Sequence, residues 1–133
     1  MKLTIEQLSR FTPQDMIDLA KIWPNTDIAL LNARLSGSHA VFAARFNDRL
    51  LGAVQVIIDN EWNEGRLVAP QVRAVTRRRG VGLYLMTEVQ RLLPEINHWW
   101  LGNNQYFEDL AVMAQFMDAC GFCQEPDGWH KRR

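Results

Sequence analysis

Three consecutive arginines followed by two closely spaced glycines stand between a β-rich segment and the segment with the clearest helical periodicity. The motif reads Arg77-Arg78-Arg79-Gly80-Val81-Gly82. The first turn of a helix presents unpaired backbone N–H groups and a partial positive charge, so it attracts anions. Glycines at its start let an anion approach the backbone, and arginines add forked donors that suit phosphate oxygens. The motif therefore predicts a phosphate-binding loop inside a strand–loop–helix unit.

Two common phosphate-binding motifs do not match this loop. A Rossmann fingerprint would need a glycine where Leu85 stands, and a P-loop would need Lys-Ser or Lys-Thr after its second glycine. A plainer alternative is a solvated basic turn at the start of a helix. Three arginines beside the positive end of a helix dipole are unfavourable on their own, which favours an anionic ligand.

The balance of charge limits the kinds of partner. The 133 residues include 15 Lys plus Arg and 15 Asp plus Glu, so the net charge is zero, whereas a general nucleic-acid or membrane binder needs a broad basic field. The length and the 47% hydrophobic content predict one globular domain, residues 1–133. The apolar runs are too short to span a bilayer and the N-terminus lacks a secretory signal, so we expect a cytoplasmic protein.

The order of the expected elements indicates a mixed sheet. Strands are expected at 3–8, 40–46, 50–58, 67–75, 96–101, 122–124 and 129–131, and helices at 13–22, 26–35, 80–93 and after Asp109. Asn47-Asp48-Arg49 is the expected turn of the first hairpin. Pro70 interrupts the strand at 67–75 and predicts a bulge or an edge position there. We therefore predict the α+β (mixed α/β) class, in the order β-α-α-β-β-β-α-β-α-β-β.

The two cysteines, Cys120 and Cys123, are spaced C-x-x-C. A redox pair of this spacing usually opens a helix, whereas this pair follows the end of one, with Gly121 between. A zinc site would need two further ligands. The sequence favours a buried Cys120 and a Cys123 on a strand, both reduced.

The loop and the last helix resemble those of the GNAT (Gcn5-related acetyltransferase-like) superfamily. Arg77-x-x-Gly80-x-Gly82 is similar to its Arg/Gln-x-x-Gly-x-Gly/Ala motif, and Gly121-Phe122 to the Gly-Phe that follows its last helix. The resemblance implies one GNAT domain with a central, mostly antiparallel sheet flanked by helices. It also implies that the loop wraps the pyrophosphate of acetyl-CoA or CoA, and that the preceding strand pairs with the pantetheine arm. The implied cofactor-binding residues are Gln71, Val72, Arg77, Arg78, Arg79, Gly80, Val81, Gly82 and Leu83.

A second resemblance is more specific and runs along the whole chain. Its segments are Lys21-Ile22-Trp23-Pro24, Ala43-Ala44-Arg45-Phe46-Asn47-x-Arg49-Leu50-Leu51, Val75-Thr76-Arg77-Arg78-Arg79-Gly80-Val81-Gly82 and Gly128-Trp129. They are similar to the PanD maturation and regulatory factors, the PanZ or PanM family.

This resemblance implies a protein partner. It implies that the chain, loaded with acetyl-CoA or CoA, docks on the zymogen of aspartate 1-decarboxylase (PanD) and promotes its autocatalytic cleavage to the pyruvoyl form. It also implies that the chain restrains the mature enzyme, so that pantothenate and CoA synthesis respond to CoA. Arg45 and Asn47 are the candidate partner-binding residues. The alternative for them is an ordinary β-turn with solvated ends.

The residues give little support to acetyl transfer itself. Many GNAT enzymes carry a tyrosine acid four residues before the Gly of Gly-Phe, where this chain has Met117, which cannot protonate a thiolate. The strand at 67–75 has no Asp or Glu as a base, and Glu61, Glu64 and Tyr106 remain as substitutes on expected loops. The sequence thus predicts CoA binding without efficient catalysis, and neither a catalytic residue nor a metal. An N-acetyltransferase of unknown acceptor and a nucleic-acid module that uses the arginines stay open as alternatives.

Overall fold

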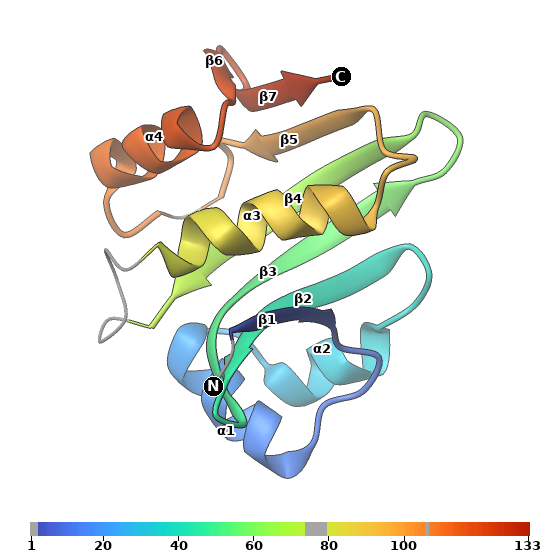
Figure 1. Cartoon of the computed structure of the whole chain (residues 1–133), viewed down its shortest axis with the longest axis vertical. Coiled ribbons are helices and arrows are strands. Elements are labelled where there is room, and N and C mark those ends of the chain that lie inside the picture. Colours follow the sequence, from blue (N-terminus) through green and yellow to red (C-terminus); the bar gives the residue numbers. More distant parts are fainter. Residues whose placement is uncertain (1–2, 74–79, 106) are drawn as a thin grey trace.

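The computed structural model describes residues 3–73, 80–105 and 107–133, which form seven strands and four helices (Figure 1). Along the chain these are β1 (Thr4–Gln7), α1 (Pro13–Ile22), α2 (Ile28–Arg34), β2 (His39–Phe46), β3 (Arg49–Asp59), β4 (Glu64–Val72), α3 (Val81–Leu92), β5 (His98–Gly102), α4 (Leu110–Ala119), β6 (Cys123–Glu125) and β7 (Gly128–Arg132). The predicted order and the α+β class are confirmed. Local signals account for several boundaries: Thr12 caps α1, Asp109 caps α4, and Gly121 ends α4 with a φ of 86°.

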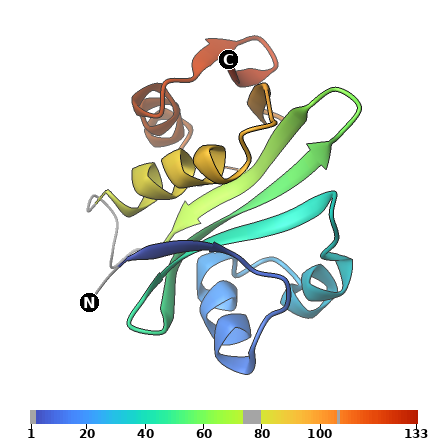
Figure 2. The ribbon, with the colours of Figure 1, turned by 45° about the vertical axis from the view of Figure 1, so that its right-hand side comes forward.

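The strands form one sheet in the order β1-β2-β3-β4-β5-β7-β6. Its described neighbours pair antiparallel except β4 and β5, which are parallel and joined through α3. Figures 1 and 2 show α1 and α2 on one face and α3 and α4 on the other. Successive residues of β2 alternate between the two faces: Ala40 and Phe42 pack with α3 and α4, while Val41 and Ala43 pack with α1 and α2. The fold therefore has two hydrophobic cores, one on each face.

The β2–β3 hairpin has a shorter turn than the sequence predicts. Asn47 and Asp48 form it alone, with φ values of 51° and 64°, because Arg49 already belongs to β3. A two-residue turn with both residues in the left-handed region matches the twist of antiparallel strands, and Asn and Asp tolerate that region well.

A buried carboxylate ties α1 to this hairpin. Asp18 is fully buried and accepts hydrogen bonds from Arg49 Nη2 (2.7 Å), the Leu50 N–H (3.0 Å) and Gln14 Nε2 (3.1 Å). Burial favours the neutral carboxyl, but these hydrogen bonds outweigh it and hold the pKa of Asp18 below its ordinary value of 3.8.

Replacing Asp18 with asparagine is expected to lower the free energy of unfolding by about 2 kcal/mol at neutral pH, because a charged acceptor of several donors is lost. The folded pKa of Asp18 lies below the unfolded one, so its contribution is present above about pH 4 and disappears as the pH falls through the folded value. Urea unfolding at several pH values measures the difference between wild type and Asp18→Asn. That difference should shrink below about pH 4, and a difference unchanged to about pH 2.5 would contradict the assignment.

Of the two alternatives predicted from Pro70, a bulge or an edge position, the structure shows the bulge. β4 lies between β3 and β5, so it is not an edge strand. Its register with β3 shifts between Ala53 and Gln55, opposite Ala69, whose φ is 50°. The strand ends at Val72, three residues before the predicted end.

The C-terminal hairpin is packed into the sheet. Trp129 on β7 is 2% exposed and belongs to the core with α3 and α4. Trp62, in the β3–β4 connection, is 69% exposed. None of the described helices is both long and apolar enough to cross a membrane.

Candidate functional site

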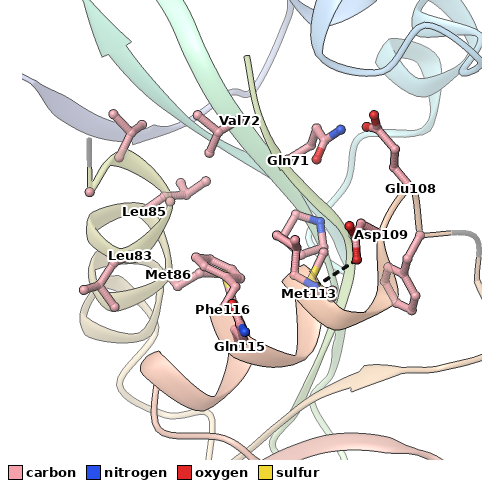
Figure 3. Close-up of a pocket in the computed structure, with 16 residues that line it drawn as sticks. Gln71, Val72, Leu83, Leu85, Met86, Glu108, Asp109, Met113, Gln115 and Phe116 are labelled. Atoms are coloured by element: carbon pink, nitrogen blue, oxygen red, sulfur yellow. Dashed lines mark hydrogen bonds between the residues drawn. The ribbon is translucent and has the colours of Figure 1, made fainter. Parts of the chain in front are cut away.

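A groove opens between α3 and α4, on the face of the sheet where β4 and β5 part. The pairing of β4 with β5 ends at Leu67 and Leu101, while β4 continues along β3 to Val72. The groove has a volume of about 660 Å³, and Figure 3 shows its lining. Its walls come from three segments that are far apart in the sequence: the end of β4, the start of α3, and α4 with the residues before it.

One end of the groove is formed by the start of α3, which has no side-chain cap. Gly80 is the N-cap of α3, with a φ of 78°, and provides no side-chain cap, whereas Thr12, Asp27 and Asp109 cap the other described helices. The first turn of α3 contains no acidic residue. A Cβ on Gly80 would meet nothing within 4 Å, so the space beside the cap is open. The backbone N–H groups of this first turn, beside open space, make this end of the groove suited to an anion.

The structure brings together six of the nine predicted cofactor-binding residues. The groove is lined by Gln71, Val72, Gly80, Val81, Gly82 and Leu83. The other three, Arg77, Arg78 and Arg79, lie outside the described residues. The predicted strand and helix residues therefore share one cavity, although 72 and 80 are separated along the chain.

The sequence analysis missed the wall that α4 provides. This wall consists of Phe107, Glu108, Asp109, Val112, Met113, Gln115 and Phe116. Figure 3 shows Phe116 reaching from α4 toward α3, and a Cβ on Gly82 would lie 3.0 Å from Phe116 Cε1. The sequence carried one signal: the α4 segment, LAVMAQFMDA, is apolar on nearly all sides, more than one core-facing side requires. In the structure only Met117 of this helix is fully buried, and Val112 is 58% exposed.

The positions considered for acid–base chemistry lie in different surroundings. Met117, at the position of the tyrosine acid, is fully buried in the core and does not line the groove. Glu64 was expected on a loop but begins β4, where it bonds His98 Nδ1 at 2.7 Å. Gln71 lies seven positions further along the strand, about 23 Å away at the usual rise, so Glu64 is too remote to act in the groove. Tyr106 lies outside the described residues.

Two carboxylates do line the groove. Asp109 caps α4 by accepting from the Val112 N–H at 3.1 Å, the bond drawn as a dashed line in Figure 3. Glu108 precedes it and lines the same wall. Asp109 thus serves as the helix cap, and Glu108 is a second carboxylate on the same wall.

The two predicted partner-binding residues differ in their surroundings. Arg45, near the end of β2, pairs with Glu6 (3.0 Å) and with the buried Asp15 (3.2 Å). Burial opposes its charge, but these hydrogen bonds outweigh burial and raise the pKa of Arg45. Asn47 is exposed at the tip of the hairpin. In both ribbon views this tip lies on the same side of the molecule as the N-terminal end of α3 (Figures 1 and 2).

The cysteine pair shows no sign of redox or metal chemistry among the described residues. Both cysteines are free; Cys120 is buried and Cys123 is exposed, as the sequence favours. Burial raises the pKa of the Cys120 thiol to about 11, which makes it a poor nucleophile.

A cluster of possible metal ligands, Glu125, Asp127 and His130, lies elsewhere, on the C-terminal hairpin. Its members already pair with other side chains. Arg132 binds Glu125 at 2.8 Å, and His130 bonds both Asp127 (2.7 Å) and His98 (2.8 Å). We therefore interpret the cluster as a hydrogen-bond network that holds β6 and β7 to β5.

The fold and the groove define a class of protein. Solved structures of acetyltransferases have the same architecture. The ribosomal-protein-S18-alanine N-acetyltransferase of Escherichia coli superposes with a TM-score of 0.73, over 97% of this chain and 89% of its own, at 14% identity. That likeness shows the fold alone.

Closer similarity identifies the family. The family model for the GNAT acetyltransferase domain PanZ matches residues 2–130, and the chain belongs to the PanZ family. It is 48% identical to the PanD regulatory factor of Salmonella typhimurium over 99% of this chain and 100% of that protein. It is 47% identical to the PanD regulatory factor of E. coli K12, over 98% and 99% respectively. An E. coli protein whose solution structure was determined with coenzyme A bound covers 100% of both chains, with a TM-score of 0.87 and 46% identity.

Proposed function

We propose that this protein binds CoA or acetyl-CoA in the groove and, in that form, binds aspartate 1-decarboxylase in the cytoplasm. It then promotes autocatalytic cleavage of the zymogen and restrains the mature enzyme, so that pantothenate and CoA synthesis follow the supply of CoA. The observation that carries the proposal is the groove that ends at the uncapped start of α3, in a chain that belongs to the PanZ family.

The residues present fit a CoA-type ligand. Gly80 and Gly82 leave the first turn of α3 accessible, and an anionic pyrophosphate would bind its N–H groups together with Arg77, Arg78 and Arg79. The amide-containing arm would lie along Gln71 and Val72, with apolar contacts from α4. CoA supplies the phosphate charge and a terminal thiol, which carries the acyl group in acetyl-CoA.

Regulation is favoured over catalysis because the position of the usual acid, Met117, is buried in the core. Glu108, a carboxylate on the groove wall, is the observation that favours the alternative, an N-acetyltransferase of unknown acceptor. The alternatives differ in a thiol-release assay. An acetyltransferase releases CoA thiol from acetyl-CoA only when an amine acceptor is present, and a pure regulator releases none.

Replacing Asn47 with glycine is expected to weaken binding to the decarboxylase by at least about 10-fold, as loss of a central hydrogen-bonding contact does. Glycine accepts the φ of 51° at this position, so the turn survives and only the amide is lost. Affinity for acetyl-CoA should not change, since Asn47 does not line the groove.

Replacing Arg45 should affect stability as well as partner binding. Because Arg45 pairs with Glu6 and Asp15, Arg45→Ala is expected to lower the free energy of unfolding as well as partner affinity. Surface plasmon resonance on immobilised zymogen, with acetyl-CoA present and absent, measures both variants. Unchanged partner affinity in Asn47→Gly would contradict the placement of the docking face at the hairpin tip.

A further inference from the structure

The groove runs from the start of α3 along β4 toward Pro70, as its lining residues show. At one end, the start of α3 meets the end of β4: a Cβ on Gly82 would lie 3.3 Å from Val72 Cγ2. From Val72 the strand runs back through Gln71 and Pro70 to Ala69, a distance of about 10 Å at the usual strand rise. The arm of a CoA-type ligand that starts at the α3 end and follows β4 therefore ends beside Pro70 and Ala69.

Gln105 lies behind this inner end and joins the two strands there. Its Oε1 accepts from the Ala69 N–H at 2.9 Å, and its Nε2 donates to the Gly102 carbonyl at 3.1 Å. The side-chain amide thus joins β4 to the end of β5 just beyond Leu67 and Leu101, where their own pairing stops. Gln105 does not line the groove itself but ties together the segments that carry Pro70 and Phe107, which do.

The bulge that receives this bond is held from the opposite face as well. Ala69 has a φ of 50°, an uncommon conformation for a residue with a side chain. Its carbonyl accepts from Trp23 Nε1 at 2.8 Å, from the end of α1. Hydrogen bonds from both faces of the sheet therefore hold the backbone at Ala69, next to the inner end of the groove.

A thioester carbonyl at the end of an arm could compete with Gln105 for the Ala69 N–H. The exchange is unfavourable, because it replaces the bond to the Gln105 amide oxygen by a bond to a thioester oxygen, which is a weaker acceptor. The ligand should therefore end at Pro70 without displacing the glutamine.

We propose that Gln105 is a positioning residue that limits the length of the acyl group the groove accepts. By holding the segments of Pro70 and Phe107 in place at the inner end, it leaves room for a free thiol or an acetyl thioester and none for a six-carbon acyl chain. The inference rests on the proposed function, because it presupposes a CoA arm that ends beside Ala69.

The test compares affinities for CoA, acetyl-CoA and hexanoyl-CoA by isothermal titration calorimetry on the full chain. Wild type should bind hexanoyl-CoA at least about 10-fold more weakly than acetyl-CoA, and Gln105→Ala should reduce this ratio to about 2-fold. Gln105→Asn, which is too short to reach both partners, should reduce the ratio in the same direction if the alanine variant does not fold. Asn103→Ala is the matched control: it removes a bond to the Pro126 carbonyl from the same connection without touching β4, and should keep the wild-type ratio.

The outcomes separate this inference from the proposed function. Equal binding of acetyl-CoA and hexanoyl-CoA by wild type would overturn the role of Gln105 while leaving CoA binding intact. An equal loss of affinity for all three ligands in both Gln105 variants would also overturn it, because a purely structural residue does not change the ratio. Failure of wild type to bind any of the three would overturn the proposed function and this role with it.

Discussion

Replacing Gly128 with alanine is expected to lower the free energy of unfolding by about 4 kcal/mol. A Cβ at this position would lie 2.1 Å from the Leu101 carbonyl oxygen and 2.9 Å from Gly102 Cα, both backbone atoms of β5. The φ of 145° adds strain for any residue with a side chain. The pairing of β7 with β5 therefore has to shift, and the buried Trp129 beside it loses its packing.

Substitutions at two other glycines distinguish the effect of backbone strain from that of the steric clash. Gly121 also has a positive φ, 86°, but a Cβ there would meet only the flexible end of Lys131, at 3.4 Å, so Gly121→Ala should cost about 1 kcal/mol from strain alone. A Cβ on Gly37 would meet nothing within 4 Å, so Gly37→Ala should be neutral or slightly stabilising. Urea unfolding measures all three. A Gly128→Ala loss no larger than that of Gly121→Ala would show that β7 does not approach β5 as closely as described.

Replacing Gly82 with valine should weaken CoA binding by about 100-fold, equivalent to about 2.8 kcal/mol. The Cβ alone would lie 3.0 Å from Phe116 Cε1 and 3.3 Å from Val72 Cγ2, and the two further methyl groups of valine have no room. Phe116 must then move into the groove between α3 and α4, where the arm of the ligand is proposed to lie. Isothermal titration calorimetry with CoA measures the loss.

Two variants control for this effect. Gly82→Ala should cause a smaller loss, because Phe116 needs to yield by only a few tenths of an ångström. Tyr84→Val changes the same helix at a position that is 39% exposed and does not line the groove, so its CoA affinity should equal that of wild type. Wild-type affinity in Gly82→Val, with the fold intact by circular dichroism, would place the ligand elsewhere.

Local signals in the sequence predicted the parts of the fold that local chemistry determines. Thr12 and Pro13 fix the start of α1, Asp109 caps α4, and Gly121 ends it. The same kind of signal placed Gly80 at the start of α3 and so located one end of the groove. Each of these features depends on residues within a few positions of one another.

The features that the sequence did not predict depend on contacts between distant segments. Arg45 meets Glu6, which is 39 residues away, so a residue expected to be free for a partner is paired within the fold. Gln105 bonds Ala69 across 36 residues, and nothing in its neighbours in the sequence indicates that tie. The bulge at Pro70 was one of two local alternatives, and only the place of β4 inside the sheet decides between them.

The most direct test of the account is the cleavage of purified aspartate 1-decarboxylase zymogen, mixed with this protein, with and without acetyl-CoA. Mass spectrometry of the zymogen follows the two fragments and the pyruvoyl group. We expect cleavage that depends on both the protein and acetyl-CoA, and that is strongly reduced with Gly82→Val. Absence of cleavage, with acetyl-CoA bound normally to wild type, would contradict the regulatory function and leave an acetyltransferase with an unidentified acceptor as the better account.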